Sequence, residues 1–290
     1  PSNNPQASGY SSETIEAIVL VTKGGNTEFG ILGDRSVRFN GGGGDEIVTV
    51  DSYDSRQGLY QAQAARANVQ IRTNSPAPRA IEVTGRVTIK GDVVLPPGSD
   101  PNETFRQTSK TWTSISGSVR VATEKALVES VELPMLTDGG VLELSGDDVV
   151  QLPAGLYRFR EIRLSGNARL EFSGAHTDVY VEGNVHISGN GGIMTPQNSP
   201  TNLTLFVTGA ETSFSGKPPL FAKVVAPHAT VALAGHSELY GAVAAQDVVL
   251  HGGARFHCDE ALKQYDETLN PSGPGAPSQV SLLSWRESAP

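Results

Sequence analysis

Two acidic residues set three positions apart are the first feature of the sequence that could do chemistry. Asp51 and Asp54 stand beside hydroxyl groups in the stretch Asp51-Ser-Tyr-Asp54. A loop with two carboxylates and hydroxyl oxygens could bind a hard cation such as Ca²⁺, which takes several oxygen ligands. The spacing does not match the EF-hand loop, and Asp and Ser also cap turns through backbone hydrogen bonds. Turn capping is the favoured interpretation, with a metal near Asp51 and Asp54 as the alternative.

The six histidines are the other potential metal ligands: His176, His186, His228, His236, His251 and His257. A metal site needs several converging ligands. His236 and His251 lie in consecutive repeats, but they occupy different positions of the repeat. His236 aligns with Gly253, and His257 aligns with Tyr240. Stacking of repeats therefore builds no histidine ladder, and the sequence predicts exposed loop histidines rather than a metal centre.

Paired acids would be needed for the hydrolysis of a glycosidic bond. Asp147-Asp148 is one adjacent pair, but neighbours on a strand point to opposite faces. A second pair, Asp259-Glu260, falls on a predicted helix. His176-Thr-Asp178 could place an imidazole and a carboxylate on one strand face, without a third group beside them. A solvated strand face is the favoured interpretation, so no catalytic or cofactor-binding residue is assigned and no cofactor is expected.

Composition excludes several functional classes. The chain has 290 residues, a formal net charge of −9 and a pI near 5.2, and no two Lys or Arg residues are adjacent. Nucleic-acid binding is therefore not expected, and neither is contact with an anionic membrane. The stretch Ser215-Gly-Lys217 lacks the flanking residues of a phosphate-binding loop. With one cysteine, Cys258, neither an intrachain disulfide nor a cysteine zinc cluster can form.

An internal repeat indicates how these residues are positioned. Its frame is an apolar residue, any residue, Gly, three residues and a second apolar residue. Three copies also share a small residue before an Arg or Glu: Leu164–Leu170, Leu233–Leu239 and Leu250–Phe256. Four copies keep only the frame: Val83–Ile89, Leu144–Val150, Val181–Ile187 and Ile187–Ile193. The distance from Leu233 to Leu250 is the length of one coil of a solenoid rather than of a domain.

The repeat predicts an all-β fold, a right-handed parallel β-helix. Short strands place aliphatic residues on one face, Gly makes the corners, and stacked coils bury a continuous core. An antiparallel sandwich remains the alternative fold, although it does not explain repetition in the same phase. A short helix at Asp259–Glu267 is expected to cap the C-terminal end of the stack. Threonines do not recur in register, as the flat face of an ice-binding β-helix would require.

Three regions are expected along the chain. Residues 1–28 form an N-terminal lead-in and first strand, residues 29–269 form the β-helix, and residues 270–290 form a linker and a C-terminal segment. Because the chain opens at Pro1 rather than Met and shows no signal peptide, we expect that an N-terminal segment has been removed from it.

Scattered motifs between residues 29 and 287 resemble the β-helical domain of PilX-type proteins, which are bacterial surface proteins related to type IV pilus assembly. The resemblance is carried by these stretches: Phe29–Gly41, Val50–Ser55, Asn68–Asn74, Val83–Val93, Leu152–Tyr157, Leu239–Ala245, Phe256–Leu262 and Ser284–Glu287. It implies a pilin-like export anchor followed by an exposed β-helix, and it implies no catalytic residues.

These observations together predict a non-enzymatic, extracellular or pilus-associated structural or adhesive module. Its partners would be pilus subunits or a surface glycan or protein, bound by outward side chains of a rigid solenoid. One alternative is a carbohydrate-active β-helix enzyme, a polysaccharide lyase or hydrolase. The other is a polymer-forming scaffold similar to bactofilins, suggested by the stretch Val83–Asp92.

Overall fold

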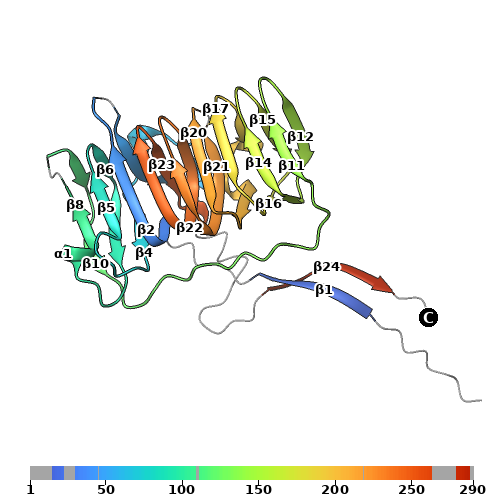
Figure 1. Ribbon diagram of the computed structural model, residues 1–290, viewed down its shortest axis with the longest axis horizontal. Coiled ribbons are helices and arrows are strands. Elements are labelled where there is room, and N and C mark those ends of the chain that lie inside the picture. The colour runs from blue at the N-terminus through green and yellow to red at the C-terminus, as the bar shows by residue number, and fades with distance from the viewer. Residues whose placement is uncertain are drawn as a thin grey trace, which may run out of the picture. The chain divides into compact units, whose positions relative to one another are not determined.

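The described residues form a parallel β-helix with three faces (Figure 1). The computed structural model describes residues 30–44, 46–108, 111–217 and 219–262, together with the backbone of two further strands. Every pairing between named strands in the range 30–262 is parallel. The predicted all-β parallel β-helix is therefore confirmed, and the antiparallel sandwich is excluded.

Each face is a ladder of parallel strands. In spatial order, the first face consists of β10 (Val119–Val121), β7 (Gly91–Leu95), β4 (Val69–Thr73), the start of β2 (Ile31–Gly41), the middle of β22 (Glu238–Gly252), the middle of β21 (Leu220–Leu233), β19 (Leu203–Val207), β16 (Thr177–Val181) and β13 (Leu156–Phe159). The second face consists of β8 (Phe105–Gln107), β5 (Ile81–Thr84), the ends of β2, β22 and β21, then β20 (Glu211–Gly216), β17 (Val185–Gly189), β14 (Glu161–Leu164) and β11 (Val141–Leu144).

The third face is divided into two ladders. One consists of β9 (Thr113–Ile115), β6 (Val87–Ile89), β3 (Val48–Tyr53), β23 (Arg255–Asp259) and the starts of β22 and β21. The other consists of β18 (Gly192–Met194), β15 (Arg169–Ser173) and β12 (Val149–Pro153). Short helices lie in the connections: α1 (Pro101–Thr104), η1 (Ser55–Gln57), η2 (Ala62–Ala64), η3 (Pro196–Asn198) and η4 (Pro200–Asn202).

Apolar residues of successive coils stack inside the helix. On the second face, Leu164 pairs in register with Ile187, which pairs with Phe214. The same column continues from Phe214 to Leu233 and Leu250. All five side chains are buried. Burial of such a column coil after coil supplies the hydrophobic free energy that a single coil lacks, as the repeat predicted.

The repeat glycines make the corners. Gly146, Gly166 and Gly189 end the second face with φ of 59°, 71° and 87°, a left-handed conformation that favours glycine. They also stack closely, since a Cβ on Gly189 would lie 2.4 Å from the carbonyl oxygen of Gly166. Gly183, from the copy Val181–Ile187, lies instead at the corner between the first and second faces. The sequence repeat therefore marks two different corners.

The chain enters this stack at its middle. From β2 it winds to one end, where β10 ends at Val121, and it then crosses to the opposite end, where β11 begins at Val141. From there it winds back until β23 ends at Asp259. As a result, β22 lies against β2, and β23 lies against β3. We call this joint between coils that are distant in the sequence the seam.

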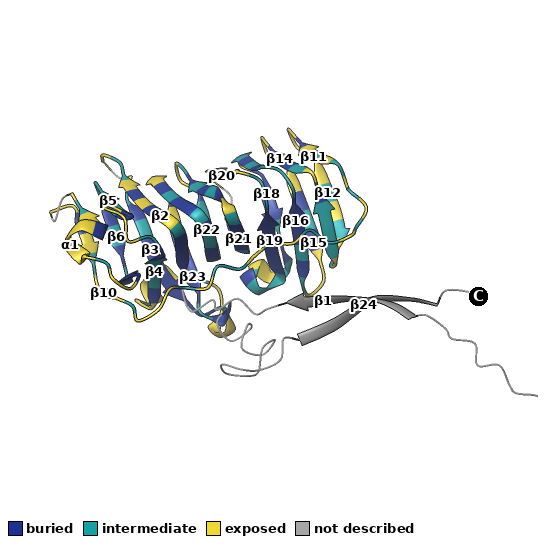
Figure 2. Cartoon of the chain, turned by 60° about the horizontal axis from the view of Figure 1, so that its bottom comes forward, coloured by how far each residue is buried: buried dark blue, intermediate teal, exposed yellow. Residues whose placement is uncertain are grey.

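The crossover, residues 122–140, lies on the outside of the first face (Figure 2). Asn74 donates a hydrogen bond from Nδ2 to the carbonyl oxygen of Ala126 at 2.9 Å, and Lys223 Nζ lies 3.4 Å from Glu129 Oε2. Apolar residues of the crossover also pack on aromatic and aliphatic residues of the first face: Val131 and Leu133 on Tyr180, Phe206 and Val225. The crossover thus covers part of this face.

The predicted capping helix at Asp259–Glu267 is wrong in two respects: the residue at which the helix begins and its position at an end of the stack. Asp259 is the last residue of β23, Glu260 lies in a turn, and helix begins at Ala261. The part of the prediction after Leu262 lies outside the described residues. Because the N-terminal coil of β2 and β3 covers the C-terminal coil, the helix begins beside the seam and does not close an end of the stack.

A separate unit is formed by residues 1–24 and 267–290, while residues 25–266 form the β-helical unit. In the separate unit, β1 (Ile15–Thr22) and β24 (Gln279–Glu287) pair antiparallel. Among the described residues, no helix has the length and hydropathy required to cross a membrane.

Candidate functional site

The seam unites two acidic stretches that the sequence separates widely. Because β3 pairs with β23, Asp51 lies beside His257 and Tyr53 lies beside Asp259. Asp51 and His257 are 206 residues apart in the chain. Both stretches contain acidic pairs that the sequence marks as candidate sites, but the two stretches lie close together only because of the order of the coils.

A buried Asp–His–Tyr cluster lies at the seam. Nδ1 of His257 lies 2.6 Å from Oδ1 of Asp51, and the Tyr60 hydroxyl donates to Oδ2 of Asp51 at 2.8 Å. The rings of Tyr60 and Tyr240 lie 4.0 Å and 4.6 Å from the imidazole of His257 between centroids. Asp51 and His257 are each 2% exposed, so substrate has no access to this acid–base pair. Burial, followed by the hydrogen bond to Asp51, raises the pKa of Tyr60, which keeps its hydroxyl a donor at neutral pH.

Asp54 has the capping role that the sequence favoured. Its side chain accepts a hydrogen bond from the backbone N–H of Arg56 and caps η1. The Arg56 guanidinium also donates to both carboxylate oxygens, at 2.6 Å and 2.8 Å. The hydrogen bond from the Arg56 side chain lowers the pKa of Asp54 against the opposing effect of burial. Since Asp51 bonds to His257 and Tyr60 instead, the two carboxylates serve different partners and do not converge on one cation.

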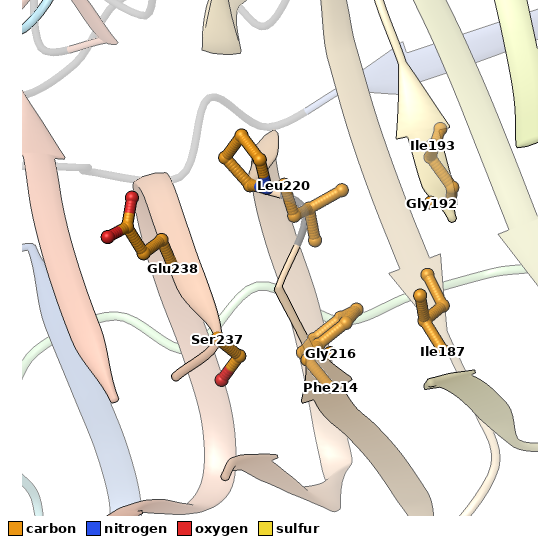
Figure 3. Close-up of a pocket in the computed structure, with 9 residues that line it drawn as sticks. Ile187, Gly192, Ile193, Phe214, Gly216, Leu220, Ser237 and Glu238 are labelled. Carbon is orange, nitrogen blue, oxygen red and sulfur yellow. The ribbon is translucent and has the colours of Figure 1, made fainter. Parts of the chain in front are cut away.

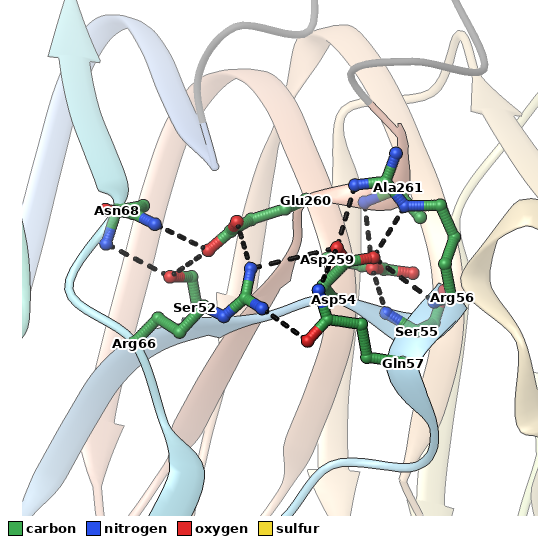
Figure 4. A network of polar contacts seen from close by, with 10 residues as sticks. All are labelled: Ser52, Asp54, Ser55, Arg56, Gln57, Arg66, Asn68, Asp259, Glu260 and Ala261. Carbon is green, nitrogen blue, oxygen red and sulfur yellow. Dashed lines mark hydrogen bonds and ion pairs between the residues drawn. The ribbon is translucent and has the colours of Figure 1, made fainter.

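Asp259 and Glu260 extend this polar network (Figure 4). Glu260 accepts hydrogen bonds from Arg66, Ser52 and Asn68, at 2.9 Å, 2.9 Å and 3.0 Å. Oδ1 of Asp259 accepts from two backbone N–H groups, those of Ser55 and Ala261. Its Oδ2 is buried without a hydrogen-bond partner, and burial raises the pKa of this carboxyl group. The network ties the chain on both sides of the seam.

A second ion pair crosses the seam on the second face. Nε of Arg35 donates to Oδ1 of Asp247 at 3.0 Å, and a second guanidinium nitrogen contacts Oδ2. Ser36 donates to the same carboxylate at 2.6 Å. Although burial raises the pKa of Asp247, the hydrogen bonds from Arg35 and Ser36 and the charges of Arg35 and Arg38 together lower it by more, so the net shift of the pKa is downward. The N-terminal and C-terminal halves of the stack are therefore joined to each other by ion pairs and hydrogen bonds on both the second and the third face.

The histidines are only partly as predicted. His228, His236 and His251 are exposed, and the predicted alignment of His257 with Tyr240 is confirmed. The prediction of exposed loop histidines is wrong for His257, because its strand lies under Tyr60 and Tyr240 at the seam, and His176 and His186 are only partly exposed. No group of three or more His, Cys, Asp or Glu side chains in the described residues is arranged to hold a metal ion.

His176 and Asp178 do meet, as the sequence suggested. Nε2 of His176 lies 2.9 Å from Oδ1 of Asp178, and Nδ1 lies 2.6 Å from the carbonyl oxygen of Thr201. Burial lowers the pKa of His176, but the hydrogen bond to Asp178, the charge of Asp178 and the contact with the Thr201 carbonyl together raise it by more, so the pKa is raised overall. Because both ring nitrogens contact protein oxygens, the imidazole is held in a structural contact. His186 is also bonded, with Nδ1 at 2.8 Å from Ser213 Oγ.

The pair Asp147-Asp148 lies in a turn and not on a strand as assumed. Asp148 Oδ2 accepts from the backbone N–H of Ser145 at 3.0 Å, and Asp147 Oδ1 accepts from Asn167 at 2.8 Å. Asp148 therefore caps its own turn, and Asp147 bonds to a side chain of the next coil. Asp259-Glu260 is likewise committed to the seam, so neither pair supplies two free facing acids.

The cavities are small. One lies between Phe214, Leu220 and Ser237 and has a volume of about 10 Å³ (Figure 3), roughly that of one water molecule. The Ser237 hydroxyl is buried there without a hydrogen-bond partner. Another, of about 150 Å³, lies beside the loop after β3, between Tyr53 and Arg66. Neither has the size of a usual small-molecule site, which spans roughly 300–1,000 Å³.

The outward side of the second face is an open surface of mixed polarity. One outward column runs in register along the whole face: Glu143, Arg163, His186, Ser213, Ala232, Val249, Arg38, Glu82 and Arg106. Charged residues occupy both ends of this column and uncharged residues its centre. This column contains no threonine, although Thr49 and Thr88 do pair in register on the third face. It can offer hydrogen bonds and charges to a flat partner surface.

Comparisons with known proteins add little about chemistry. A domain family of unknown function, DUF7305, matches residues 137–265, less than half of the chain. No curated protein matches. One similar solved structure is an ice-binding protein from an Antarctic biological consortium, 11% identical, with a TM-score of 0.49, covering 89% of this chain and 96% of that chain. Another is a glycosylated ice-binding protein from an Arctic yeast, 15% identical, with a TM-score of 0.43, covering 80% and 90%.

Proposed function

We propose that this chain is a non-enzymatic structural and adhesive β-helix module, which binds a partner through the outward side of its second face. The observation that supports this most is the openness of that face. The crossover covers part of the first face, and the loop carrying Tyr60 covers the third face at the seam. The second face instead presents one outward column from Glu143 to Arg106. A surface held by stacked coils is rigid, so binding requires little ordering of side chains or backbone.

The chemistry of the column suggests the kind of partner. Arg163 and Arg38 are exposed; Arg163 donates two hydrogen bonds to Glu161, and the remaining guanidinium N–H groups of the two arginines can donate to carboxylates or sugar hydroxyls. Small residues between them, such as Ser213 and Ala232, leave room for a flat ligand. Pilus subunits and surface glycans both offer such groups, and both fit the proposal.

An extracellular or pilus-associated location completes the proposal. This location rests on the sequence resemblance to PilX-type surface proteins, for example in the stretches Val50–Ser55 and Ser284–Glu287. A hydrophobic pilin-type helix encoded directly upstream of Pro1 would support it. Immunogold labelling of sectioned bacterial cells would measure it, and labelling confined to the cytoplasm would contradict it.

Binding is tested with a glycan array and with purified bacterial pili as probes. The double variant Arg163→Ala, Arg38→Ala is expected to lose most of the binding to whichever probe the unaltered chain retains. Arg169→Ala is a matched control, because Arg169 is similarly exposed but lies on the third face. Equal loss in the control would contradict a role for the second face. Turnover of any polysaccharide in a broad degradation screen would contradict a non-enzymatic module.

A further inference from the structure

The two ends of the β-helix lie at the same point of the coil: each terminal turn runs from the second face through the third face to the first. At one end, the last turn consists of β8 on the second face, β9 on the third and β10 on the first, as Figure 1 shows for β8 and β10. At the other end, the first turn consists of β11 on the second face, β12 on the third and β13 on the first. One end therefore stops after a first-face strand, and the other starts with a second-face strand.

Because of this common phase, the two ends fit each other as consecutive turns. If the β11 end of one copy follows the β10 end of another, β8 meets β11, β9 meets β12, and β10 meets β13. Each meeting is parallel and continues an existing ladder. Among the described residues, each of these strands pairs with a named strand on one side only. The outer edge of β13 is partly occupied by the end of the crossover, because Gly139 N–H donates to the carbonyl oxygen of Arg158 and Arg160 N–H donates to that of Gly140. The edges of β11 and β12 at this end, and of β8, β9 and β10 at the other, have N–H and C=O groups for a partner.

The seam shows that this sequence already forms such a joint. There, β22 and β2 are not consecutive in the chain, yet they pair over both the first and second faces. The C-terminal coil ends on the third face with β23, and the N-terminal coil begins on the first face with β2. Coils of this chain thus stack in phase without a covalent connection.

Inward apolar residues at both ends are incompletely covered. Val119 and Val121 on β10 are 37% and 40% exposed, although Val93, one coil further in, is fully buried. At the other end, Leu142 and Val150 are only partly buried. The helix at Ala261 starts beside the seam, so it covers neither end. A further coil would bury these side chains, which is the stabilisation that a solenoid end lacks.

Charge on the second face favours one order of the two ends. Arg106 on β8 and Glu143 on β11 are both exposed and lie at opposite ends of the same outward column. Continuation of that column from one copy to the next places them directly side by side. An opposite-charge pair across neighbouring strands stabilises their pairing, and like charges oppose it. The reverse order, end against like end, would place Arg106 beside Arg106 or Glu143 beside Glu143.

We infer that this chain associates head to tail with a second copy of itself, the β8–β10 end of one copy pairing with the β11–β13 end of the next. Such a contact joins two different surfaces, so its repetition gives an open, linear assembly rather than a closed dimer. This inference is independent of the partner bound by the second face, because it concerns the ends of the stack.

Sedimentation velocity of the full chain over a wide range of concentration tests the inference. We expect a series of species that grows with concentration. Glu143→Arg and Arg106→Glu should each weaken association by about tenfold or more, and the double reversal should restore it. Glu211→Arg is the matched control, because Glu211 is exposed on the same face but in the middle of the stack; it should change nothing. Circular dichroism verifies that each variant is folded.

Two results would overturn the inference. One is a single monomeric species at every concentration. The other is association that neither single reversal weakens, which would assign the contact to a different surface, such as the unit containing β1 and β24. Neither result affects the glycan and pilus binding tests, so failure here and failure of the proposed function remain distinguishable.

Discussion

Removing the carboxylate of Asp51 should destabilise the seam more than any other single polar change there. In Asp51→Ala, the imidazole of the buried His257, which packs against the rings of Tyr60 and Tyr240, and the hydroxyl of the partly buried Tyr60 both lose their partner. A buried group left without a hydrogen bond costs about 1–3 kcal/mol and a partly exposed one costs less, so the free energy of unfolding should fall by about 2–4 kcal/mol. Tyr60→Phe leaves Oδ2 of the buried Asp51 without its donor but keeps the pair of Asp51 and His257, so its cost should be about 1–3 kcal/mol and smaller than that of Asp51→Ala.

Urea unfolding followed by circular dichroism and by tyrosine fluorescence measures these differences. Asp147→Ala is a suitable control, because Asp147 lies in an exposed turn and holds one side-chain hydrogen bond; a change within about 0.5 kcal/mol is expected. A loss below about 1 kcal/mol in Asp51→Ala, or one no larger than that of Tyr60→Phe, would refute the assignment of Asp51 as the centre of a buried network.

The remaining predictions concern pH and backbone geometry. Because its pKa is lowered, Asp54 contributes stability that is present above its ordinary value of 3.8 and is lost as the pH falls through the lowered value; Asp54→Asn should therefore cost stability at neutral pH and nothing below both values. The pKa of Asp259 is raised, so its effect on stability has the opposite pH dependence: its contribution to the free energy of unfolding declines as the pH rises from 3.8 through the raised value. Asp259→Asn should remove this decline, as measured by urea unfolding at several pH values. Gly166→Ala should lower the free energy of unfolding by about 1–3 kcal/mol, because φ is 71° and the new Cβ would lie 2.9 Å from the backbone nitrogen of Gly146. Gly43→Ala, which meets no atom within 4 Å, is its control; equal melting temperatures for the two variants would contradict the packing argument.

The local part of the fold was predictable from the sequence. The spacing of Leu164, Leu233 and Leu250 predicted an inward column, and they stack there. The repeat glycines predicted corners, since no other residue adopts the left-handed conformation so readily. The inward column and the glycine corners both depend on residues close together in the chain, and local periodicity in the sequence reveals such relations.

The order of the coils was not predictable in this way. Pairing of β23 with β3 depends on which coil lies next in space, and periodicity carries no information about that. This is why the helix after Asp259 was placed at an end, and why His257 was expected to be exposed. One signal was available: Phe39-Asn-Gly41 has the same apolar–x–Gly corner as Leu250-His-Gly252, and the two stack in register at the seam.

The two halves of the chain are joined at the seam into one continuous stack, and the buried cluster, the open face and the matching ends all depend on this joint. Methyl–methyl nuclear Overhauser effects in a protein labelled at Ile, Leu and Val test it directly. The structure predicts contacts between Ile31 and Val243 and between Val37 and Val248, which pair in register across the seam. Absence of both contacts, in a sample that still shows the contact between Leu233 and Leu250 within the C-terminal half, would contradict it.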